Sequence, residues 1–393
     1  MRKIYMDHTA GAPVDRRVVS AMHPFLEATY GNPSSAHSFA QEAKEGLKDA
    51  RSSVASLIRA EESEEIFFTS CATESNNWAI RGFAARNHDK GRHIITTTIE
   101  HMSVINVCKH LTKQGFKISY LPVDKHGIVD LKALETELTD ETILVSIMYA
   151  NGEIGTIEPI KEASEIVHAR NACLHVDATA AIGQFPIDVR KAGADLMTLS
   201  SNEIGGPKGV GALYSKKGTR LQPLIFGGGQ ERGMRSGTEN VPGIVGMGKA
   251  ASLTNLEIGD RITKLKRMRD RLIKGLLSNI PYSFLNGHPS QRLPNNVAVR
   301  FSFIEGESML LNLDMAGVAA SSGSACTAKT LEPSHVLRAI GLKHEEAHGS
   351  LLFTLGTQNA EEDVDYVVDL LPDIVKRLRA LSPLTPKELT GSV

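Results

Sequence analysis

Three short segments of the sequence carry side chains that could do chemistry, and each directly follows an apolar run typical of a β-strand. Cys71-Ala72-Thr73-Glu74 follows the first run, Glu100-His101 the second and Asp177-Ala178-Thr179 the third. A carboxylate such as Asp177 could pair with a protonated pyridine nitrogen, and His101 could stack on such a ring and move protons. Either residue alone is better explained as a structural hydrogen-bonding group, but their order and spacing favour the chemical interpretation.

The first segment also suits an anion. It leads straight into a helical pattern, and the backbone N–H groups at a helix start bind a phosphate readily, helped here by the hydroxyl of Thr73. A threonine at this place is equally typical of an ordinary helix cap. The segment by itself therefore leaves both interpretations open.

Cys326 is the thiol best placed for reaction. It lies in Ser321-Ser322-Gly323-Ser324-Ala325-Cys326-Thr327, and such a run of small polar residues is typical of an exposed loop. A nucleophilic or sulfur-carrying thiol needs that access. We interpret the other three cysteines, Cys71, Cys108 and Cys173, as small buried hydrophobic residues.

A third kind of chemistry is suggested by His344-Glu345-Glu346-Ala347-His348, which matches the H-E-x-x-H pattern of zinc proteases. That motif needs the middle of a helix, a third ligand and a cleft, whereas Gly341 and Gly349 limit any helix here to one or two short turns. The sequence also contains no G-x-x-x-x-G-K-[ST] phosphate loop. Neither a metalloprotease nor a nucleotide-binding protein is favoured.

The elements that must position these residues alternate along the chain from about residue 39 to 255. Helical patterns such as 39–60 and 75–87 separate the strand-like runs 65–70, 93–99, 117–123, 142–149, 173–177, 196–200 and 210–214. This alternation predicts an α/β fold with a mostly parallel, seven-stranded sheet covered by helices on both faces. Active sites of such sheets lie at the carboxyl ends of the strands.

The pattern changes near residue 256, where an apolar stripe at helical spacing begins on a strongly basic helix. Strand-like runs at 296–303 and 351–355 and a final helix at 360–381 follow. We therefore predict a large domain over 15–255 and a smaller α+β domain over 1–14 and 256–393, which carries the Cys326 loop.

Composition excludes several classes of function. The formal net charge of 393 residues is −1 with both signs mixed along the chain, so neither nucleic acid nor a membrane surface is expected as a partner. No apolar run is long enough to span a bilayer and the first residues do not resemble a signal peptide, which predicts a cytoplasmic protein. Four cysteines without C-x-x-C spacing form neither a disulfide framework nor a thiolate zinc site.

Together, these motifs resemble those of the cysteine desulfurases of the IscS/NifS type, which are fold-type-I pyridoxal-phosphate-dependent transferases. The resemblance runs nearly end to end. It is carried by 31–35, 69–77, Glu100-His101, 151–155, 175–179, 206–214, 227–238 and the Cys326 loop with Leu331-Glu332-Pro333-Ser334.

The resemblance implies a homodimer with its active sites at the subunit boundary. Pyridoxal phosphate would stack under His101 and pair its ring nitrogen with Asp177. Its phosphate would be held by Ala72, Thr73 and Ser200, and by Thr238 from the partner subunit. Cys326 would take sulfur from L-cysteine as a persulfide and hand it to an iron–sulfur scaffold protein such as IscU.

One departure from the family pattern concerns the cofactor lysine. The family reads Ser-Gly-His-Lys before the Gly-Pro-Lys-Gly turn, whereas this chain reads Ser200-Ser201-Asn202-Glu203. A carboxylate cannot form the family's Schiff base, nor do the lysine's work of holding the cofactor and shuttling the Cα proton. Lys208 is no substitute, because the family keeps that lysine as well.

Further departures surround this one. Gly152 and Ala180 replace an Asn and a Gln, Cys71 replaces a Gly, and Leu352 replaces the Arg that clamps the substrate carboxylate. Losing that charge-assisted contact costs about 1.5–3 kcal/mol of substrate binding. Several coordinated losses indicate a natural site that no longer binds amino acids.

The leading hypothesis is a desulfurase homologue in iron–sulfur assembly without autonomous activity. Pyridoxal phosphate would then bind noncovalently if it binds at all, and Cys326 would carry persulfide or act as the metal ligand of a [2Fe-2S] cluster shared with the scaffold. The first alternative is an active pyridoxal-phosphate-dependent desulfurase that converts L-cysteine to L-alanine and an enzyme persulfide, with Glu203 or His101 moving the proton. An aminotransferase or lyase, and a purely structural partner protein, are further alternatives.

Overall fold

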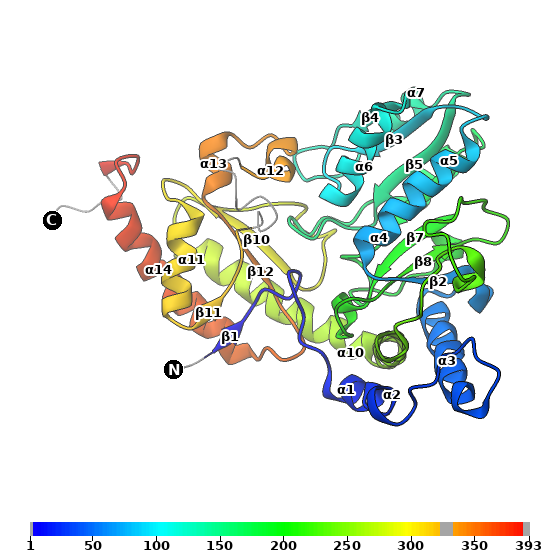
Figure 1. Ribbon diagram of the computed structural model, residues 1–393. Helices are drawn as coiled ribbons and strands as arrows, with labels where there is room; N and C mark the ends of the chain where they lie inside the picture. The colour runs from blue at the N-terminus through cyan, green and yellow to red at the C-terminus, as the bar shows by residue number, and fades with distance from the viewer. Residues whose placement is uncertain (1–2, 323–332, 388–393) are drawn as a thin grey trace.

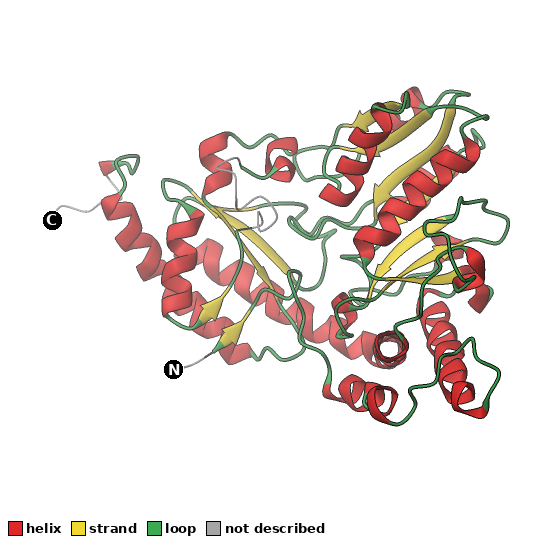
Figure 2. Ribbon diagram, viewed as in Figure 1, coloured by secondary structure: helices red, strands yellow, loops and turns green. Residues whose placement is uncertain are grey.

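The computed structural model describes residues 3–322 and 333–387. Its strands form two separate groups, and one long helix runs from one group to the other (Figure 1). The larger group lies toward the middle of the chain, whereas the smaller is built from both ends of the chain. Helices and strands alternate through the larger group, as the sequence pattern predicts (Figure 2).

The larger group is a seven-stranded sheet of order β2-β8-β7-β6-β5-β3-β4. All neighbours pair in parallel except β8, which is antiparallel to both β7 and β2. The predicted mostly parallel sheet is therefore confirmed. Its strands are β2 (Ile66–Thr69), β3 (His93–Thr97), β4 (Lys117–Leu121), β5 (Thr142–Met148), β6 (Cys173–Asp177), β7 (Leu196–Ser200) and β8 (Gly211–Ser215).

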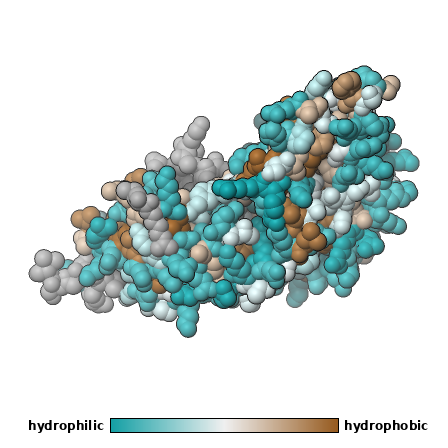
Figure 3. All heavy atoms as spheres, turned by 90° about the horizontal axis from the view of Figure 1, so that it is seen from below, coloured by the Kyte–Doolittle hydropathy of each residue, from teal (hydrophilic) through white to brown (hydrophobic). Residues whose placement is uncertain are grey.

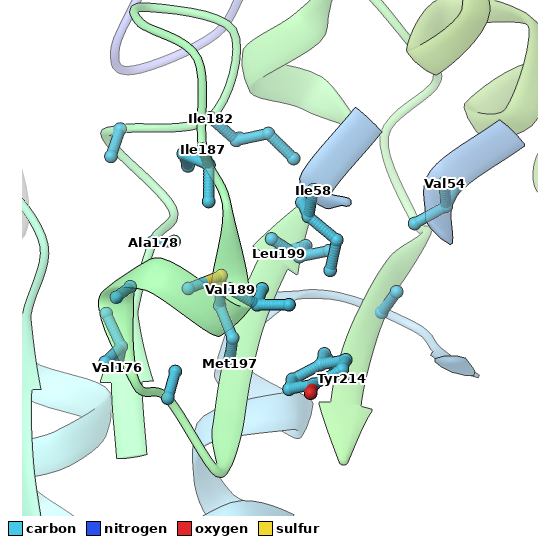
Figure 4. Packing of buried hydrophobic residues seen from close by; sticks show 14 of the residues in the cluster. Val54, Ile58, Val176, Ala178, Ile182, Ile187, Val189, Met197, Leu199 and Tyr214 are labelled. Carbon is cyan, nitrogen blue, oxygen red and sulfur yellow. The ribbon is translucent and has the colours of Figure 1, made fainter. Parts of the chain in front are cut away.

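Helices cover both faces of this sheet. Successive side chains of a strand point to opposite faces, so each face has a hydrophobic core of its own. In β3, Ile95 packs into the core under α3 and α8, whereas Ile94 packs into the core under α5 and α6. Figure 4 shows the first core, in which Val54 and Ile58 of α3 lie against Leu199 and Tyr214 of the sheet. The helices of this part are α1 (Arg16–Met22), α2 (Pro24–Glu27), α3 (Gln41–Ile58), α4 (Ala72–Asn77), α5 (Phe83–Asn87), α6 (Met102–Thr112), α7 (Leu131–Glu137), α8 (Ile160–His168) and α9 (Val189–Ala192).

The smaller group has its own buried core. Ile4 and Met6 of the N-terminal segment pack there with apolar residues of the C-terminal third. Its elements are the parallel pair β1 (Ile4–Tyr5) and β11 (Val318–Ala319), the antiparallel strands β9 (Ser283–Leu285), β10 (Asn296–Phe301) and β12 (Ser350–Thr354), and the helices α11 (Gly306–Met315), α12 (His335–Ala339), α13 (His344–His348) and α14 (Glu361–Leu381).

The helix α10 (Val241–Asn279) joins the two parts. Its first half packs Ile244 and Met247 into the sheet core, and its second half packs Leu265 and Leu272 into the smaller core. The hydrophobic pattern of the sequence therefore changes near residue 256 because one continuous helix passes from the sheet core to the smaller core.

The surface seen from below is mostly hydrophilic, and its hydrophobic side chains lie in several small groups (Figure 3). Across residues 3–322 and 333–387, no helix combines the length and the apolar character needed to cross a membrane.

Candidate active site

A cavity of about 530 Å³ lies where β3, β5, β6 and β7 end at the same edge of the sheet. This is the edge at which a parallel α/β sheet places its ligand site. Asp7, Ser321 and Leu352 of the smaller part close the cavity from the other side. The predicted residues Ala72, Thr73, His101, Asp177 and Ser200 all line this cavity, although they are spread over more than a hundred positions of the chain.

Asp177 is the last residue of β6 and is 4% exposed. Its Oδ2 accepts a hydrogen bond of 2.7 Å from the Nδ2 of Asn76, and its Oδ1 accepts one of 3.0 Å from the backbone N–H of Thr179. These bonds fix the carboxylate at the floor of the cavity. Sequence reasoning missed Asn76, which donates from α4 and whose Oδ1 is buried without a partner among the described residues.

His101 immediately precedes α6 and caps it. Its Nδ1 accepts a hydrogen bond from the backbone N–H of Ser103, so the neutral ring carries its proton on Nε2. The hydroxyl of Ser103 lies 2.8 Å from the same Nδ1 and accepts from Asn76. Since Asn76 also binds Asp177, one chain of hydrogen bonds links the carboxylate to the imidazole.

The turn before α4 presents Cys71, Ala72 and Thr73 to the cavity, and Ser200 at the end of β7 lies on the same wall. Glu74 holds this turn in place, because it accepts a hydrogen bond from the backbone N–H of Ser70 and forms a salt bridge of 2.8 Å with Arg235. Burial opposes ionisation of Glu74, but its hydrogen bonds with Arg235 and Ser70 lower the pKa below its ordinary value. The turn that we predicted to bind an anion is thus held in place by Glu74, whose side chain does not line the cavity.

Cys71 corrects one sequence prediction. We interpreted it as a small buried residue, as Cys108 and Cys173 are, but Cys71 is exposed and lines the cavity. The reason is its position at the N-terminal end of α4, beyond the last residue of β2, where the chain turns outward. Its Sγ accepts a weak hydrogen bond of 3.7 Å from the hydroxyl of Ser70.

Glu203 also lines the cavity, on the short 3₁₀ turn Asn202–Ile204 that follows β7. Burial, with repulsion from Asp177, raises the pKa of this carboxyl to about 8, against the hydrogen bond from Asn202 and the attraction of Arg261. Arg261 does not line this cavity but a smaller neighbouring one of about 180 Å³, whose wall Glu203 shares. Glu203 therefore separates the two cavities.

Several carboxyl side chains line the cavity. Of the described residues that line the cavity, five are carboxylic acids and none is a lysine or arginine: Asp7, Glu100, Glu153, Asp177 and Glu203. Burial raises the pKa of Glu100 and of Glu153 to about 8 as well. Lys208 points elsewhere, since its Nζ donates to the carbonyl of Ala12.

Two of the departures noted in the sequence lie side by side. A Cβ atom added to Gly152 would lie 3.1 Å from the Cγ2 of Thr9 and 3.4 Å from the Cβ of Ala180, so the lost amide side chains leave a patch of wall with only small side chains. Leu352 of β12 adds an apolar side chain to the cavity from the smaller part. These three positions offer no side-chain hydrogen bond to a ligand.

Two predicted site residues stand apart. Thr238 is exposed and does not line the cavity of its own chain. Cys326 lies outside the described residues.

Sequence reasoning also missed His335. This residue lines the cavity, and its Nε2 hydrogen-bonds to the carbonyl of Glu100 at 2.9 Å. Burial lowers the pKa of His335.

The H-E-x-x-H segment forms α13, a helix of five residues, as short as the flanking glycines predict. The Nε2 atoms of His344 and His348 lie 3.4 Å apart. In the part of the chain that the structure describes, no group of three or more metal-binding side chains comes together.

Comparison with known proteins gives a consistent result. The family model for class-V aminotransferases matches residues 4–367. The chain is similar to cysteine desulfurase IscS 1 of Archaeoglobus fulgidus, with 58% identity over 380 residues that cover 97% of this chain and 99% of that protein. It is also similar to cysteine desulfurase IscS of Methanosarcina thermophila, with 54% identity over 387 residues that cover 98% and 95% of the two. A solved NifS-like protein superposes with a TM-score of 0.90 at 39% identity, covering 96% of this chain and 100% of that one.

Proposed function

The chain belongs to the class-V aminotransferase family and, within it, to the cysteine desulfurases of the IscS/NifS type, and from that membership we propose a role in iron–sulfur cluster assembly without autonomous desulfurase activity. The observation that carries this proposal is the cavity wall. Glu203 lines the cavity, and it stands at the sequence position where the family has its cofactor lysine. Among the described residues that line the cavity, none is a lysine. The described part of the cavity wall therefore offers no amine that would hold the cofactor covalently and move the substrate proton.

Pyridoxal phosphate, the cofactor of the family, still fits part of the cavity. Asp177 is fixed by two hydrogen bonds as a partner for a pyridinium nitrogen, and the cavity of about 530 Å³ is large enough for such a ligand. His101 would stack on the ring, and Ala72, Thr73 and Ser200 would hold the phosphate. When bound, the cofactor would supply an electron sink for the substrate Cα.

A homodimer agrees with the position of Thr238. This residue is exposed and lies away from the cavity of its own chain, so it is free to complete the phosphate site of a partner subunit. We expect the protein to act as that dimer in the cytoplasm, together with an IscU-type scaffold.

Cys326 is the residue to which we assign the surviving function. It would carry persulfide sulfur, or donate a thiolate ligand to a [2Fe-2S] cluster shared with the scaffold. Because neither role needs the lysine, both are compatible with Glu203 in the cavity.

The test is to co-purify the full chain with an IscU-type scaffold without oxygen and to record the cluster absorption. We expect the Cys326→Ser variant to lose that absorption and the Cys71→Ser variant to keep it, since Cys71 lies at the cofactor turn. An unchanged spectrum for Cys326→Ser would rule out the cluster role, and an unchanged sulfur content on the same variant would rule out the carrier role.

One observation favours a second candidate, an active desulfurase that works with noncovalent cofactor and L-cysteine. The raised pKa of Glu203, about 8, lets its carboxyl take up or release a proton near neutral pH. Sulfide release with added pyridoxal phosphate that disappears in Glu203→Gln would support this candidate.

A further inference from the structure

Two histidines of α13 face one another at the surface of the smaller part. The Nε2 atoms of His344 and His348 lie 3.4 Å apart, whereas their ring centroids lie 4.4 Å apart, so the rings approach each other at their nitrogen ends. The two residues are four positions apart, which places them on the same face of the helix. The contact is exposed to solvent, and neither ring lines the cofactor cavity.

The backbone that carries the two rings is held in place by its neighbours. Between them, Ala347 is buried and belongs to an apolar cluster with Val336 and Leu337 of α12. At the start of α13, a carboxylate oxygen of Glu346 accepts a hydrogen bond of 2.9 Å from the backbone N–H of Lys343. The spacing of the two histidines is therefore set by the fold before any ligand binds, which lowers the entropy that a ligand must overcome.

The separation of the two nitrogens suits a tetrahedral metal ion. As a hydrogen bond, a contact of 3.4 Å is longer than is usual for an N–H donor. With zinc–nitrogen bonds of about 2.05 Å, two nitrogens 3.4 Å apart subtend an angle of about 110° at the ion, which is the tetrahedral value. A square-planar or octahedral ion would need an angle of 90° and a separation of about 2.9 Å. From this geometry we propose that His344 and His348 bind a zinc ion.

The surroundings of the pair fit such an ion. Imidazole nitrogen is a common ligand of zinc, whereas magnesium and calcium prefer oxygen. Glu345 and Glu346 add two carboxylates to the same helix, against the one ammonium group of Lys343. No third metal-binding side chain joins the pair within residues 3–322 and 333–387, so water completes the coordination. The site goes beyond the proposed function, because it uses neither the cofactor cavity nor Cys326.

The experiment measures zinc binding by the full-length protein in competition with a coloured zinc chelator. Cys71 and Cys326 are first replaced by serine, so that their thiolates do not compete for the metal. We expect one zinc ion to bind per chain. His344→Gln and His348→Gln should each weaken that binding about a hundred-fold, because a single imidazole loses the advantage of two ligands on one rigid element. Glutamine is a good helix former, so α13 should persist in both variants.

His126→Gln is the matched control, because it removes one ring of a second histidine pair. The rings of His126 and His288 are also in contact, but their centroids lie 5.4 Å apart and the Nδ1 of His288 already accepts two backbone hydrogen bonds. This variant should bind zinc as tightly as the protein with both pairs. Absence of zinc binding, undiminished binding in His344→Gln and His348→Gln, or equal loss in His126→Gln would each overturn the proposal.

Discussion

At the scale of the residue, the chemistry of this cavity depends on carboxyl groups that are close enough to shift one another's pKa. Burial is the main cause that raises the pKa of Glu203 and of Glu100, and repulsion from Asp177 adds to it. Asp177 has two hydrogen-bond donors, whereas the Oε2 of Glu100 is buried without a partner among the described residues. The two glutamates are therefore groups whose surroundings oppose ionisation.

Glu100→Gln tests this electrostatic arrangement through stability. Glu100 is fully buried, and its pKa rises from 4.5 to about 8 mainly through burial. The folded state thus binds a proton that the unfolded state has lost, so the free energy of unfolding falls as pH rises from about 4.5 to 8. Glu100→Gln should remove up to about 1.4 kcal/mol per pH unit of this decline. Urea unfolding at pH 5 to 8 measures it, and parallel profiles for the two proteins would contradict it.

The exposed Cys71 gives a second prediction at this scale. In a Cys326→Ser background, one thiol should react rapidly with a thiol reagent under native conditions, because Cys108 and Cys173 are buried. Burial also raises the pKa of Cys108 to about 12, which keeps that thiol unreactive. Adding Cys71→Ser should abolish the rapid reaction. A rapid thiol that survives in the double variant would show that one of the buried cysteines is accessible.

At the scale of the element, the strands were predictable and the direction of one of them was not. Short β-branched runs separated by helical patterns are enough to place β3, β5, β6 and β7, because a buried parallel strand is apolar along its whole length. The reversal of β8 depends on the tight Gly-Pro-Lys-Gly turn after β7, where Gly209 has a positive φ of 81°. Hydrophobic patterning carries no information on strand direction.

The helix α10 shows a second limit. The first half of the helix packs against the sheet core and the second half against the smaller core. Its apolar stripe is therefore interrupted, and the sequence suggests a helix that begins near residue 256. No proline follows Pro242 within the helix, and packing against both cores lets it run continuously for 39 residues in spite of its glycines. The predicted boundary at 255/256 falls inside it.

Two glycines of α10 test how tightly this helix packs. A Cβ on Gly248 would approach the Cα of Ala50 in α3 to 2.4 Å, whereas a Cβ on exposed Gly259 would meet nothing within 4 Å. Gly248→Ala should therefore lower the free energy of unfolding by about 1–3 kcal/mol through overpacking. Gly259→Ala should raise it by about 0.5–1 kcal/mol, because alanine loses less conformational freedom in a helix. Equal effects of the two changes would show that α3 and α10 do not touch at Gly248.

At the scale of the whole molecule, the site exists only because two cores meet. The sequence identifies His101, Asp177 and Thr73 individually, since each follows or ends a strand, and the family resemblance adds Ser200. It does not reveal that Asp7 and Leu352 from the ends of the chain close the same cavity. Nor does it show that Gly152 and Ala180 lie side by side, because proximity between loops is set by the packing of the sheet.

The sequence also did not reveal that five carboxyl side chains line one cavity. These five carboxyl groups come from five separate segments, and the net charge of −1 gives no hint of such a concentration. Glu153 was noticed only as part of a family motif, and Glu100 only as a residue that follows a strand-like run. Their shared position becomes evident from the fold, which brings the ends of neighbouring strands to one edge of the sheet.

The most direct measurement is sulfide release from L-cysteine by the purified full-length protein with added pyridoxal phosphate, beside Glu203→Lys and the surface control Glu345→Lys. We expect the unaltered protein and the control to release no more sulfide than cofactor alone. Glu203→Lys should gain the absorption band of covalently bound cofactor, although Leu352 and the Gly152–Ala180 patch will limit its turnover. Catalytic sulfide release by the unaltered protein over many turnovers would contradict the proposed loss of activity and assign it the ordinary reaction of its family.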